Sequence, residues 1–548
     1  MNWTDCPDRR FLVIESTVNA QTQFHGPLPA VVDHVIVGAG SAGAVLAARL
    51  SADSACTVLL LEAGEPVDDE VARVPGRASS LWSGATAYEN LTVPQGGLGG
   101  RRIALTTGRG LGGGSSVNAM GWFHGHPEDY DGWAAQGATG WSWADLAPHL
   151  RDIEDHELGA GPHHGAGGPM PISTPYHLHP ITARFIAAGA QLGWPVSTDL
   201  NGASREGIGL VQSNIRDGAR HGVTDGYLKP VAGRPNLTVR TGCQVQRVAL
   251  DGTRAVGVHC GSQEVRARRS VILCAGALRT PQVLLLSGIG HREQLRELGI
   301  PVAAHLPGVG ANLHDHPLVP VAWPITNAPA LRGGLYENPE LTYQMIRRGP
   351  LSALGQGAAV LRSEPGLGPP DLQLSLALRG ADAGGPATPV PMATCLVALL
   401  TPDSRGTVTL RSDDPADPPL IDPGYLAVRR DLDRLRTGIR TALGLFAAPP
   451  LAAVTGPVAG LPADPPEEDL DRYVVASTGP YWHPVGTARI GTGPFSVVDA
   501  DLNVHGITGL QIADASAFPT APRGNTQATV IAFAERAAER IIRAHPHP

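Results

Sequence analysis

The sequence predicts an α/β protein in which a Rossmann-like domain, discontinuous along the chain, carries an inserted second domain. Three observations indicate this fold class. An apolar strand, a glycine turn and an alanine-rich helix follow one another over residues 31–50, a second apolar strand ends at Glu62, and a third ends at Asp514 near the other end of the chain. A chain of 548 residues is also too long for one ordinary core, which favours two large domains.

Three glycines, Gly38, Gly40 and Gly43, follow the first strand and have the spacing G-x-G-x-x-G. The first permits a tight turn, the second lets the backbone approach a pyrophosphate, and the third lets the following helix pack closely on the sheet. That helix, over 42–50, would present free N–H groups and a partial positive charge to phosphates. An unrelated glycine loop would not explain the acid Glu62, which lies where a βαβ unit binds a ribose.

Composition and charge argue against several classes of protein. The net charge of −8 argues against a general nucleic-acid or anionic-membrane partner. No stretch approaches the length of an apolar membrane span, and the run over 9–15 is too short for a signal peptide. Cys56, Cys243 and Cys274 lie in or beside apolar strands, so we expect buried inert thiols and a cytoplasmic location, although an even number of cysteines also permits disulfides.

The remaining segments suit a domain inserted into another domain. Strand patterns return over 237–276 before a short helix over 281–286, and an amphipathic helix is predicted over 529–542. The stretch 318–478 predicts a mostly antiparallel sheet with strands at 372–378, 395–400 and 407–410. We assign residues 1–29 to an N-terminal extension. The first domain has residues 30–160, 205–317 and 479–548, and the second domain has residues 161–204 and 318–478.

Two further segments could contribute to a cofactor site. Consecutive glycines over 108–118 expose backbone N–H groups, and Ser115 and Ser116 add hydroxyl donors, which predicts a second anion cradle rather than a flexible loop. The strand that ends at Asp514 can present a carboxylate or its neighbouring N–H groups to a cofactor. Because these elements lie at both ends of the chain, the pattern favours FAD, which is long and bent, over NAD.

Histidines in two other segments could carry chemistry. His483 lies between aromatic residues and a proline, and its ordinary pKa suits proton transfer near neutral pH; a histidine that only bonds the backbone is the alternative. His163 and His164 lie in a loop with neither an acid nor a further histidine at helical spacing. We therefore expect a surface loop there and no metal site.

Several of these segments together resemble the glucose–methanol–choline (GMC) oxidoreductase family. Residues 108–118 are similar to its first signature, residues 276–290 match its second signature throughout, and His483–Thr487 and Asp514–Ser516 match its C-terminal motifs. The resemblance covers residues from about 32 to 542, and the most similar branch is the choline-dehydrogenase-like alcohol dehydrogenases. It implies an FAD-binding first domain and a substrate-binding second domain.

The resemblance also implies where FAD would bind. The pyrophosphate would lie along the first glycine turn, the ribose at Glu62, the flavin along Asn118, the adenine at the backbone of Val245, and the ribityl–pyrophosphate region at Asp514. The implied FAD-binding residues are Gly38, Gly40, Ser41, Ala42, Gly43, Glu62, Ala63, Trp82, Arg109, Gly114, Ser115, Asn118, Ala119, Met120, Gly121, Val245, Ala275, Asp514, Ala515 and Ala528.

In the implied reaction His483 takes the hydroxyl proton of a primary or secondary alcohol while the carbinol carbon passes a hydride to flavin N5, which gives an aldehyde or ketone. The family pairs this histidine with an asparagine or a second histidine, but Gln527 takes that position here and Asn525 is close by. An amide cannot act as a base. We expect His483 as the sole base, Gln527 as the positioning residue and Asn525 as its alternate. Leu105 occupies the position of a histidine that some relatives bond to the flavin, so we expect non-covalent FAD.

An alternative function is a hydroxynitrile-lyase-like enzyme on the same scaffold, in which FAD is structural and His483 does acid–base work only. A non-catalytic flavin-binding protein is a third, weaker interpretation, because His483 lies in its full motif. The expected partners of the oxidoreductase are a small-molecule alcohol and an electron acceptor, which could be oxygen, a quinone or a redox protein. No nucleic acid and no integral membrane segment are expected.

Overall fold

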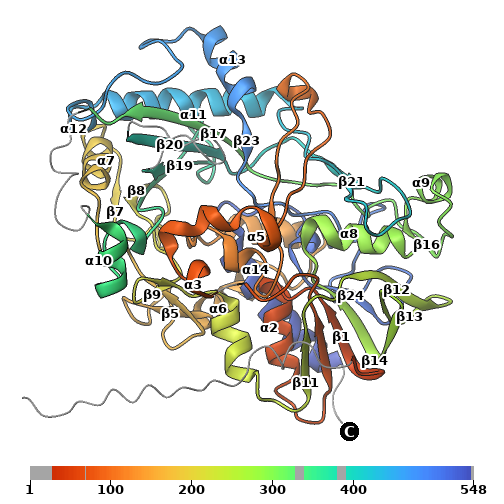
Figure 1. The fold of residues 1–548 in the computed structure, drawn as a ribbon. Coiled ribbons are helices and arrows are strands. Elements are labelled where there is room, and N and C mark those ends of the chain that lie inside the picture. Colours follow the sequence, from red (N-terminus) through yellow and green to blue (C-terminus); the bar gives the residue numbers. More distant parts are fainter. Residues whose placement is uncertain (1–27, 68, 327–337, 379–390, 545–548) are drawn as a thin grey trace, which may run out of the picture.

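The computed structural model describes residues 28–67, 69–326, 338–378 and 391–544. Most of the predicted N-terminal extension over 1–29, including the apolar run at 9–15, lies outside these residues. The described part forms two large sheets, with the first in the lower half and the second in the upper half of Figure 1.

The first sheet confirms the discontinuous Rossmann-like domain. Its strand order is β11-β2-β1-β14-β13-β12, and β24 also pairs with β14. The pairs β11–β2, β2–β1, β1–β14 and β14–β24 are parallel, whereas β12, β13 and β14 form an antiparallel meander. Strand β24 comes from residues 510–512, far along the chain, and pairs with the C-terminal part of β14, on the side of β14 away from β1. The strands are β1 (Val31–Val37), β2 (Val58–Leu61), β11 (Leu237–Arg240), β12 (Val245–Asp251), β13 (Arg254–Cys260), β14 (Gln263–Leu273) and β24 (Leu510–Ile512).

Two helices from opposite ends of the chain pack together beside this sheet. Helix α2 (Ser41–Leu50) follows the first glycine turn, and α14 (Thr526–Ala544) begins three residues before the predicted start at 529. Arg49 pairs with Glu535 at 2.7 Å, and Glu535 also accepts a hydrogen bond of 2.7 Å from the Tyr227 hydroxyl. Helices α2 and α14 are therefore joined by a partly buried ionic contact.

Two glycines of the first glycine turn have no room for a side chain. Gly38 has a φ of +102°, and a Cβ there would lie 2.5 Å from the carbonyl oxygen of Cys274. A Cβ on Gly43 would lie 1.9 Å from the carbonyl oxygen of Gly38. These contacts are with backbone, so two of the three glycines are required by close packing of turn, helix and sheet.

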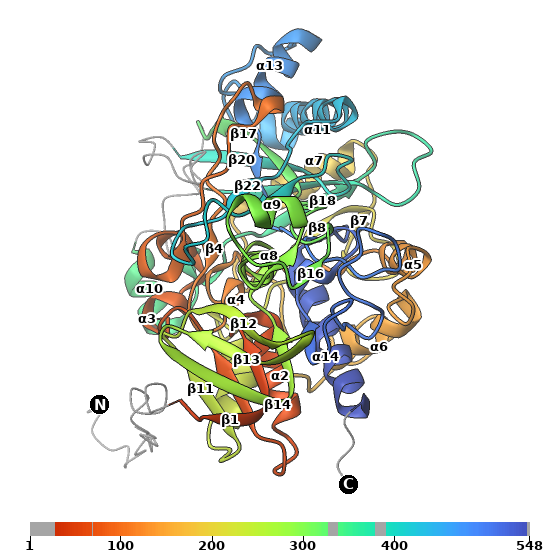
Figure 2. The same cartoon turned by 90° about the vertical axis from the view of Figure 1, so that its right-hand side faces the viewer.

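The second sheet has the order β23-β17-β20-β19-β18-β8-β7, and all its pairs are antiparallel except β7–β8. Helix α11 (Arg429–Ala447) covers one face; it lies above β17 and β20 in Figure 1 and beside β17 in Figure 2. This architecture matches the predicted antiparallel second domain with helices packed on it. The strands are β7 (Val196–Ser197), β8 (Gly207–Leu210), β17 (Pro317–Pro324), β18 (Gly357–Leu361), β19 (Leu372–Ala377), β20 (Met392–Leu399) and β23 (Gly479–Pro480).

Some short segments differ from the prediction. The strand expected over 407–410 is β21 (Thr407–Thr409), which pairs with β22 (Leu420–Asp422) outside the second sheet. Strands β8 and β23 pair within the second sheet, although the predicted boundaries place residues 207–210 and 479–480 in the first domain. The other boundaries stay predictions. Helix α8 (Gly276–Leu286) begins five residues before the predicted helix, with Pro281 inside it.

The cysteine prediction is partly wrong. Cys243 and Cys260 form a disulfide across β12 and β13, whereas Cys56, Cys274 and Cys395 are buried free thiols. Among the residues that the structure describes, no helix is long and apolar enough to cross a membrane.

The expectation of a surface loop is wrong for His164, which is buried. Its Nδ1 lies 2.8 Å from a Glu154 oxygen and its Nε2 lies 2.9 Å from an Asp199 oxygen. Glu154 is also buried, and its other oxygen lies 2.7 Å from Nε2 of His124. Burial lowers the pKa of His164, but the hydrogen bonds to Asp199 and Glu154 outweigh it and raise that pKa to about 9. Within the described ranges no group of three such side chains is placed to hold a metal ion.

Candidate active site

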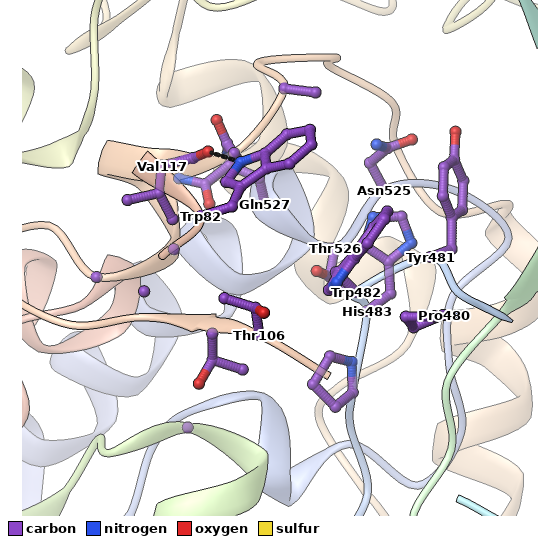
Figure 3. Close-up of a pocket in the computed structure, with 18 of the residues that line it drawn as sticks. Trp82, Thr106, Val117, Pro480, Tyr481, Trp482, His483, Asn525, Thr526 and Gln527 are labelled. Atoms are coloured by element: carbon purple, nitrogen blue, oxygen red, sulfur yellow. Dashed lines mark hydrogen bonds between the residues drawn. The ribbon is translucent and has the colours of Figure 1, made fainter. Parts of the chain in front are cut away.

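A cavity of about 970 Å³ extends from the first sheet to the second (Figure 3). At one end it is lined by the first glycine turn, by Glu62 and by the glycine segment over 113–121. At the other end it is lined by one face of the second sheet and by residues 477–484, which include His483. The two predicted domains thus contribute to one continuous site.

Most of the predicted cofactor residues line this cavity, but four do not. Gly43 packs beneath the first glycine turn, Arg109 lies over the Tyr88 ring, and Ala528 is buried in the first core. Ser115 donates to the carbonyl of Gly112 and is also turned away. The lining residues are Gly38, Gly40, Ser41, Ala42, Glu62, Ala63, Trp82, Gly114, Asn118, Ala119, Met120, Gly121, Val245, Ala275, Asp514 and Ala515.

The Glu62 carboxylate joins three loops around the first end of the cavity. It accepts hydrogen bonds from the backbone N–H groups of Ala39, Gly64 and Gly110, at 2.9, 2.9 and 3.0 Å. Burial raises the pKa of Glu62, and these N–H groups oppose that rise. The side chain therefore fixes the loops of the predicted ribose site as well as facing it.

Asp514 is held by protein donors. Its carboxylate accepts from the backbone N–H of Gly276 at 2.8 Å, from the Thr280 hydroxyl at 2.7 Å, and from Ser516. Burial raises its pKa, against these hydrogen bonds. Asp514 thereby joins the start of α8 to the segment after β24, and Ala515 beside it also lines the cavity.

The residues at the first end fit a dinucleotide such as FAD. Helix α2 has Gly40 as its N-cap residue, which has no side chain to cap it, so its first N–H groups are open to the cavity. A Cβ on Gly113 would lie 2.9 Å from Cα of Gly40, so the two glycine segments approach as closely as backbone allows. Within the described residues, Nε2 of Gln527 and Nε of Arg279 are buried donors with no partner. A ligand with a phosphate group could accept hydrogen bonds from the open N–H groups of α2 and from these two donors.

A buried arginine that the sequence did not suggest holds the predicted flavin segment. Arg220 donates to Oδ1 and to the backbone carbonyl of Asn118, both at 2.7 Å, and to the carbonyl of Ala72 at 2.8 Å. Met120, which follows, has a φ of +62°. Such backbone is uncommon for a side chain of this size, and Arg220 is one of the contacts that stabilise it.

His483 pairs with a second histidine that sequence reasoning missed. Nδ1 of His483 lies 3.0 Å from Nδ1 of His316, and both rings are buried. Burial lowers the pKa of His483 well below its ordinary value, and repulsion from His316 lowers it further. Burial also lowers the pKa of His316 to about 4, although the carbonyls of Leu400 and Pro522 oppose this. Both imidazoles are therefore neutral at physiological pH, and Nε2 of His483 is the nitrogen that remains for the cavity.

The residue before His316 fixes the backbone of His483. Asp315 accepts from the backbone N–H of His483 at 2.7 Å and from the Tyr425 hydroxyl at 2.5 Å. Burial raises the pKa of Asp315 to about 7. Trp482, before His483, has a φ of +58°, which is strained for a tryptophan. The dipeptide Asp-His at 315–316 is plain in the sequence, but His316 lies 167 residues before His483, so short-range patterns do not reveal the pairing.

The two amide residues at the start of α14 have different surroundings. Oε1 of Gln527 accepts a hydrogen bond of 2.9 Å from the Ser41 hydroxyl at the start of α2. In Figure 3, Gln527 lies toward Trp82, whereas Asn525 lies on the side that holds Tyr481 and His483. Oδ1 of Asn525 is buried and, among the described residues, has no partner. The geometry thus favours Asn525, the predicted alternate, over Gln527 as the neighbour of the base.

Leu105 does not face the cavity, although it was expected at the position of a histidine that some relatives bond to the flavin. It is fully buried in an apolar cluster with Leu278 and Leu313, whereas its neighbours Ala104 and Thr106 line the cavity. Trp82 and Trp482 also line it and stack with their ring centres 5.8 Å apart.

Comparisons with known proteins agree with this geometry. Two family models, both described as GMC oxidoreductase, match residues 32–318 and 402–534. An uncharacterised GMC-type oxidoreductase of Mycobacterium bovis is 39% identical, over 93% of this chain and 99% of its own. The mitochondrial choline dehydrogenase of Homo sapiens is 36% identical, over 94% and 90%. The crystal structure of pyridoxine 4-oxidase from Mesorbium loti superposes with a TM-score of 0.86 at 33% identity, over 94% and 100%.

Proposed function

Because the chain belongs to the GMC oxidoreductase family, we propose that it oxidises a primary or secondary alcohol to an aldehyde or ketone with bound FAD. The family acts on CH–OH donors, and the relatives named above include proteins named for choline and pyridoxine, both of which are alcohols. The observation that carries the proposal is a neutral, buried His483 at the wall of a cavity whose other end fits a dinucleotide.

FAD supplies the acceptor for hydride at flavin N5 when it is bound. The N–H groups that open α2 would bind its pyrophosphate, and Glu62 would lie at its ribose. Asn118, held by Arg220, would position the flavin end.

The histidine pair determines which nitrogen of His483 acts as the base. Because the two Nδ1 atoms face each other at 3.0 Å, one of them carries a proton and the other is bare, and we infer that the bare one is Nδ1 of His316. Nδ1 of His316 then accepts from Nδ1–H of His483. The lone pair of His483 Nε2 is left free to take the hydroxyl proton of the substrate, and Asn525 could bind the substrate oxygen.

Non-covalent FAD and the electron acceptor are further parts of the proposal. Ala104 and Thr106, which face the cavity, carry neither an imidazole nor a thiol that could bond to flavin. Acid precipitation should therefore release the flavin into the supernatant. Oxygen, a quinone and a redox protein remain the candidate acceptors, and the rate of flavin reoxidation in air distinguishes oxygen from the other two.

A cytoplasmic location is also proposed. The buried free thiols of Cys56, Cys274 and Cys395 support it, whereas the disulfide between Cys243 and Cys260 is more typical of an oxidising compartment. Fractionation of cells, with thiols counted in the denatured protein, would decide between the two.

The test of the main proposal is reduction of the bound flavin under anaerobic conditions by a panel of alcohols. We expect loss of the oxidised flavin absorbance with at least one primary or secondary alcohol. If no alcohol bleaches the flavin while a cyanohydrin is cleaved, the enzyme is a lyase on this scaffold and the proposal is wrong.

A further inference from the structure

The wall of the cavity opposite the predicted flavin segment is one face of the second sheet. Side chains alternate across a strand, so Leu318 and Pro320 of β17, Gln373 and Ser375 of β19, and Leu396 of β20 point to the cavity. Their register places Pro320, Leu396 and Ser375 in one row across the sheet. The intervening residues, such as Val319, Leu374 and Val397, belong to the core that includes α11.

This face is uncharged. The described residues that line the cavity include two carboxylates, Glu62 and Asp514, and both lie at the dinucleotide end. The charged side chains that line the rest of the cavity are Arg101 and Arg102. A substrate cation would therefore meet like charge without a carboxylate to compensate for its lost hydration.

Three polar groups form a cluster on this face beside the base. Nε2 of Gln373 lies 3.0 Å from the Ser375 hydroxyl and 3.0 Å from the Tyr481 hydroxyl, and the two hydroxyls are 3.3 Å apart. The ring of Tyr481 lies with its centre 4.6 Å from that of His483. The cluster is thus within the part of the cavity where a substrate would react.

The cluster has one acceptor and one donor to spare. Gln373 is 1% exposed, and its Oε1 has no hydrogen-bond partner among the described residues. The two hydroxyls together carry two hydrogens, and the contact between them uses one. Burial raises the pKa of Tyr481, so its hydroxyl stays protonated. A buried acceptor beside a donor is satisfied by a group that both donates and accepts, and a hydroxyl does so.

We propose that the Gln373–Ser375–Tyr481 cluster binds a second hydroxyl on an uncharged substrate with an apolar, aromatic body. Leu318, Pro320 and Leu396 supply apolar contact for that body, and Trp482 supplies an aromatic wall. This inference rests on the proposed alcohol oxidation, and it excludes a quaternary ammonium alcohol such as choline as a good substrate.

The experiment measures anaerobic flavin reduction by four probes that share a hydroxymethyl group: 1,4-benzenedimethanol, 4-methylbenzyl alcohol, 4-(hydroxymethyl)benzoate and choline. We expect the diol to exceed the methyl compound by about tenfold in kcat/KM, because one net hydrogen bond distinguishes them. The Gln373→Met variant, which keeps side-chain length, should abolish that advantage, so that the ratio of the kcat/KM values for the diol and the methyl compound falls to about one. Gln263→Met on the exposed β13–β14 hairpin is the matched control.

The outcomes separate this inference from the proposed function. Equal rates with the diol and the methyl compound in the wild type, or a preference for choline or the benzoate, would overturn the inference while alcohol oxidation stands. This comparison needs no variant, so it can overturn the inference even if the Gln373→Met protein fails to fold. Failure of every alcohol to reduce the flavin would instead overturn the proposed function and the inference with it.

Discussion

The two sheets shape the same cavity by different means. The first sheet presents backbone: N–H groups at the start of α2 and glycines that permit close approach, with Glu62 bonded to three more N–H groups. The second sheet presents side chains, of which Gln373 and Ser375 are examples. Backbone groups bind one kind of ligand and are hard to alter, whereas side chains on an alternating face can be exchanged one at a time. If the proposed function holds, cofactor binding and substrate choice are therefore expected to be separable in this chain.

The largest effect is expected at the base, where the two regions meet. His483→Ala should slow flavin reduction by alcohol by roughly 10² or more, because a positioned general base contributes about that factor. FAD content should be unchanged, since His483 lies away from the dinucleotide end of the cavity. Stopped-flow absorbance checks the rate. A variant that reduces flavin at a near-native rate would sink the assignment.

The second expected effect concerns the buried charges around His164, near the edge of the second sheet. Because folding raises the pKa of His164, its protonated form stabilises the folded protein fully at pH values below 6.5, its ordinary pKa. This stabilisation is lost as the pH rises through about 9. The lowered pKa of Glu154 adds stability above its ordinary value of 4.5, lost at lower pH. The alkaline loss should be on the order of 3 kcal/mol, because one pKa unit corresponds to about 1.4 kcal/mol.

The measurement is the free energy of unfolding from denaturant titrations between neutral and alkaline pH. His164→Gln should flatten the alkaline decline, and His163→Gln serves as the control. An unchanged decline in His164→Gln would show that another group causes it.

A third prediction tests whether the first sheet depends on backbone fit. Gly43→Ala would place a Cβ 1.9 Å from the carbonyl of Gly38, so the glycine turn must shift. We expect a loss of about 1–3 kcal/mol of stability and a protein largely free of FAD. Gly132→Ala in α5 (Pro127–Ala135) is the control, because open space surrounds that Cβ and alanine favours a helix. Equal flavin occupancy in the two variants would contradict the requirement for glycine.

The smallest expected effect separates the two amides at the start of α14. Asn525→Ala should raise KM or lower kcat for alcohols by about tenfold, the cost of one lost hydrogen bond to an oxygen that carries developing charge. Gln527→Ala should instead reduce FAD affinity, because Gln527 bonds Ser41 at the start of α2. Steady-state kinetics and flavin titration of both variants check this. The reverse pattern would restore Gln527 as the neighbour of the base.

The first region could be predicted from sequence because backbone constraints leave fixed spacings. The three glycines and Glu62 follow one another at short range, and the strand, turn and helix around them formed as expected. Short-range spacing did not predict the direction of single side chains. Ser115 was expected to face a phosphate but bonds the carbonyl of Gly112, and Leu105 is turned into an apolar cluster, because the spacing of glycines does not fix where a loop side chain points.

The second region could be predicted only as a sheet. Alternation predicts that one face of β19 is buried, but it does not say that Gln373 faces a cavity and Leu374 a core. The pair His316–His483 was also out of reach, because the partners are 167 residues apart and each is one of 20 histidines in the chain. Contacts between distant segments depend on the assembled fold, which short-range patterns do not describe.

The contact between α2 and α14 has a consequence for biosynthesis. Gln527 and Glu535 reach residues of α2 that were made 486 positions earlier, and β24 adds to β14 in a sheet whose other strands are already complete. The emerging chain therefore lacks one parallel strand and one wall of its nucleotide pocket until α14 has left the ribosome. We expect flavin to bind only after α14 has been made, and a protein ending before residue 526 to be made without bound flavin.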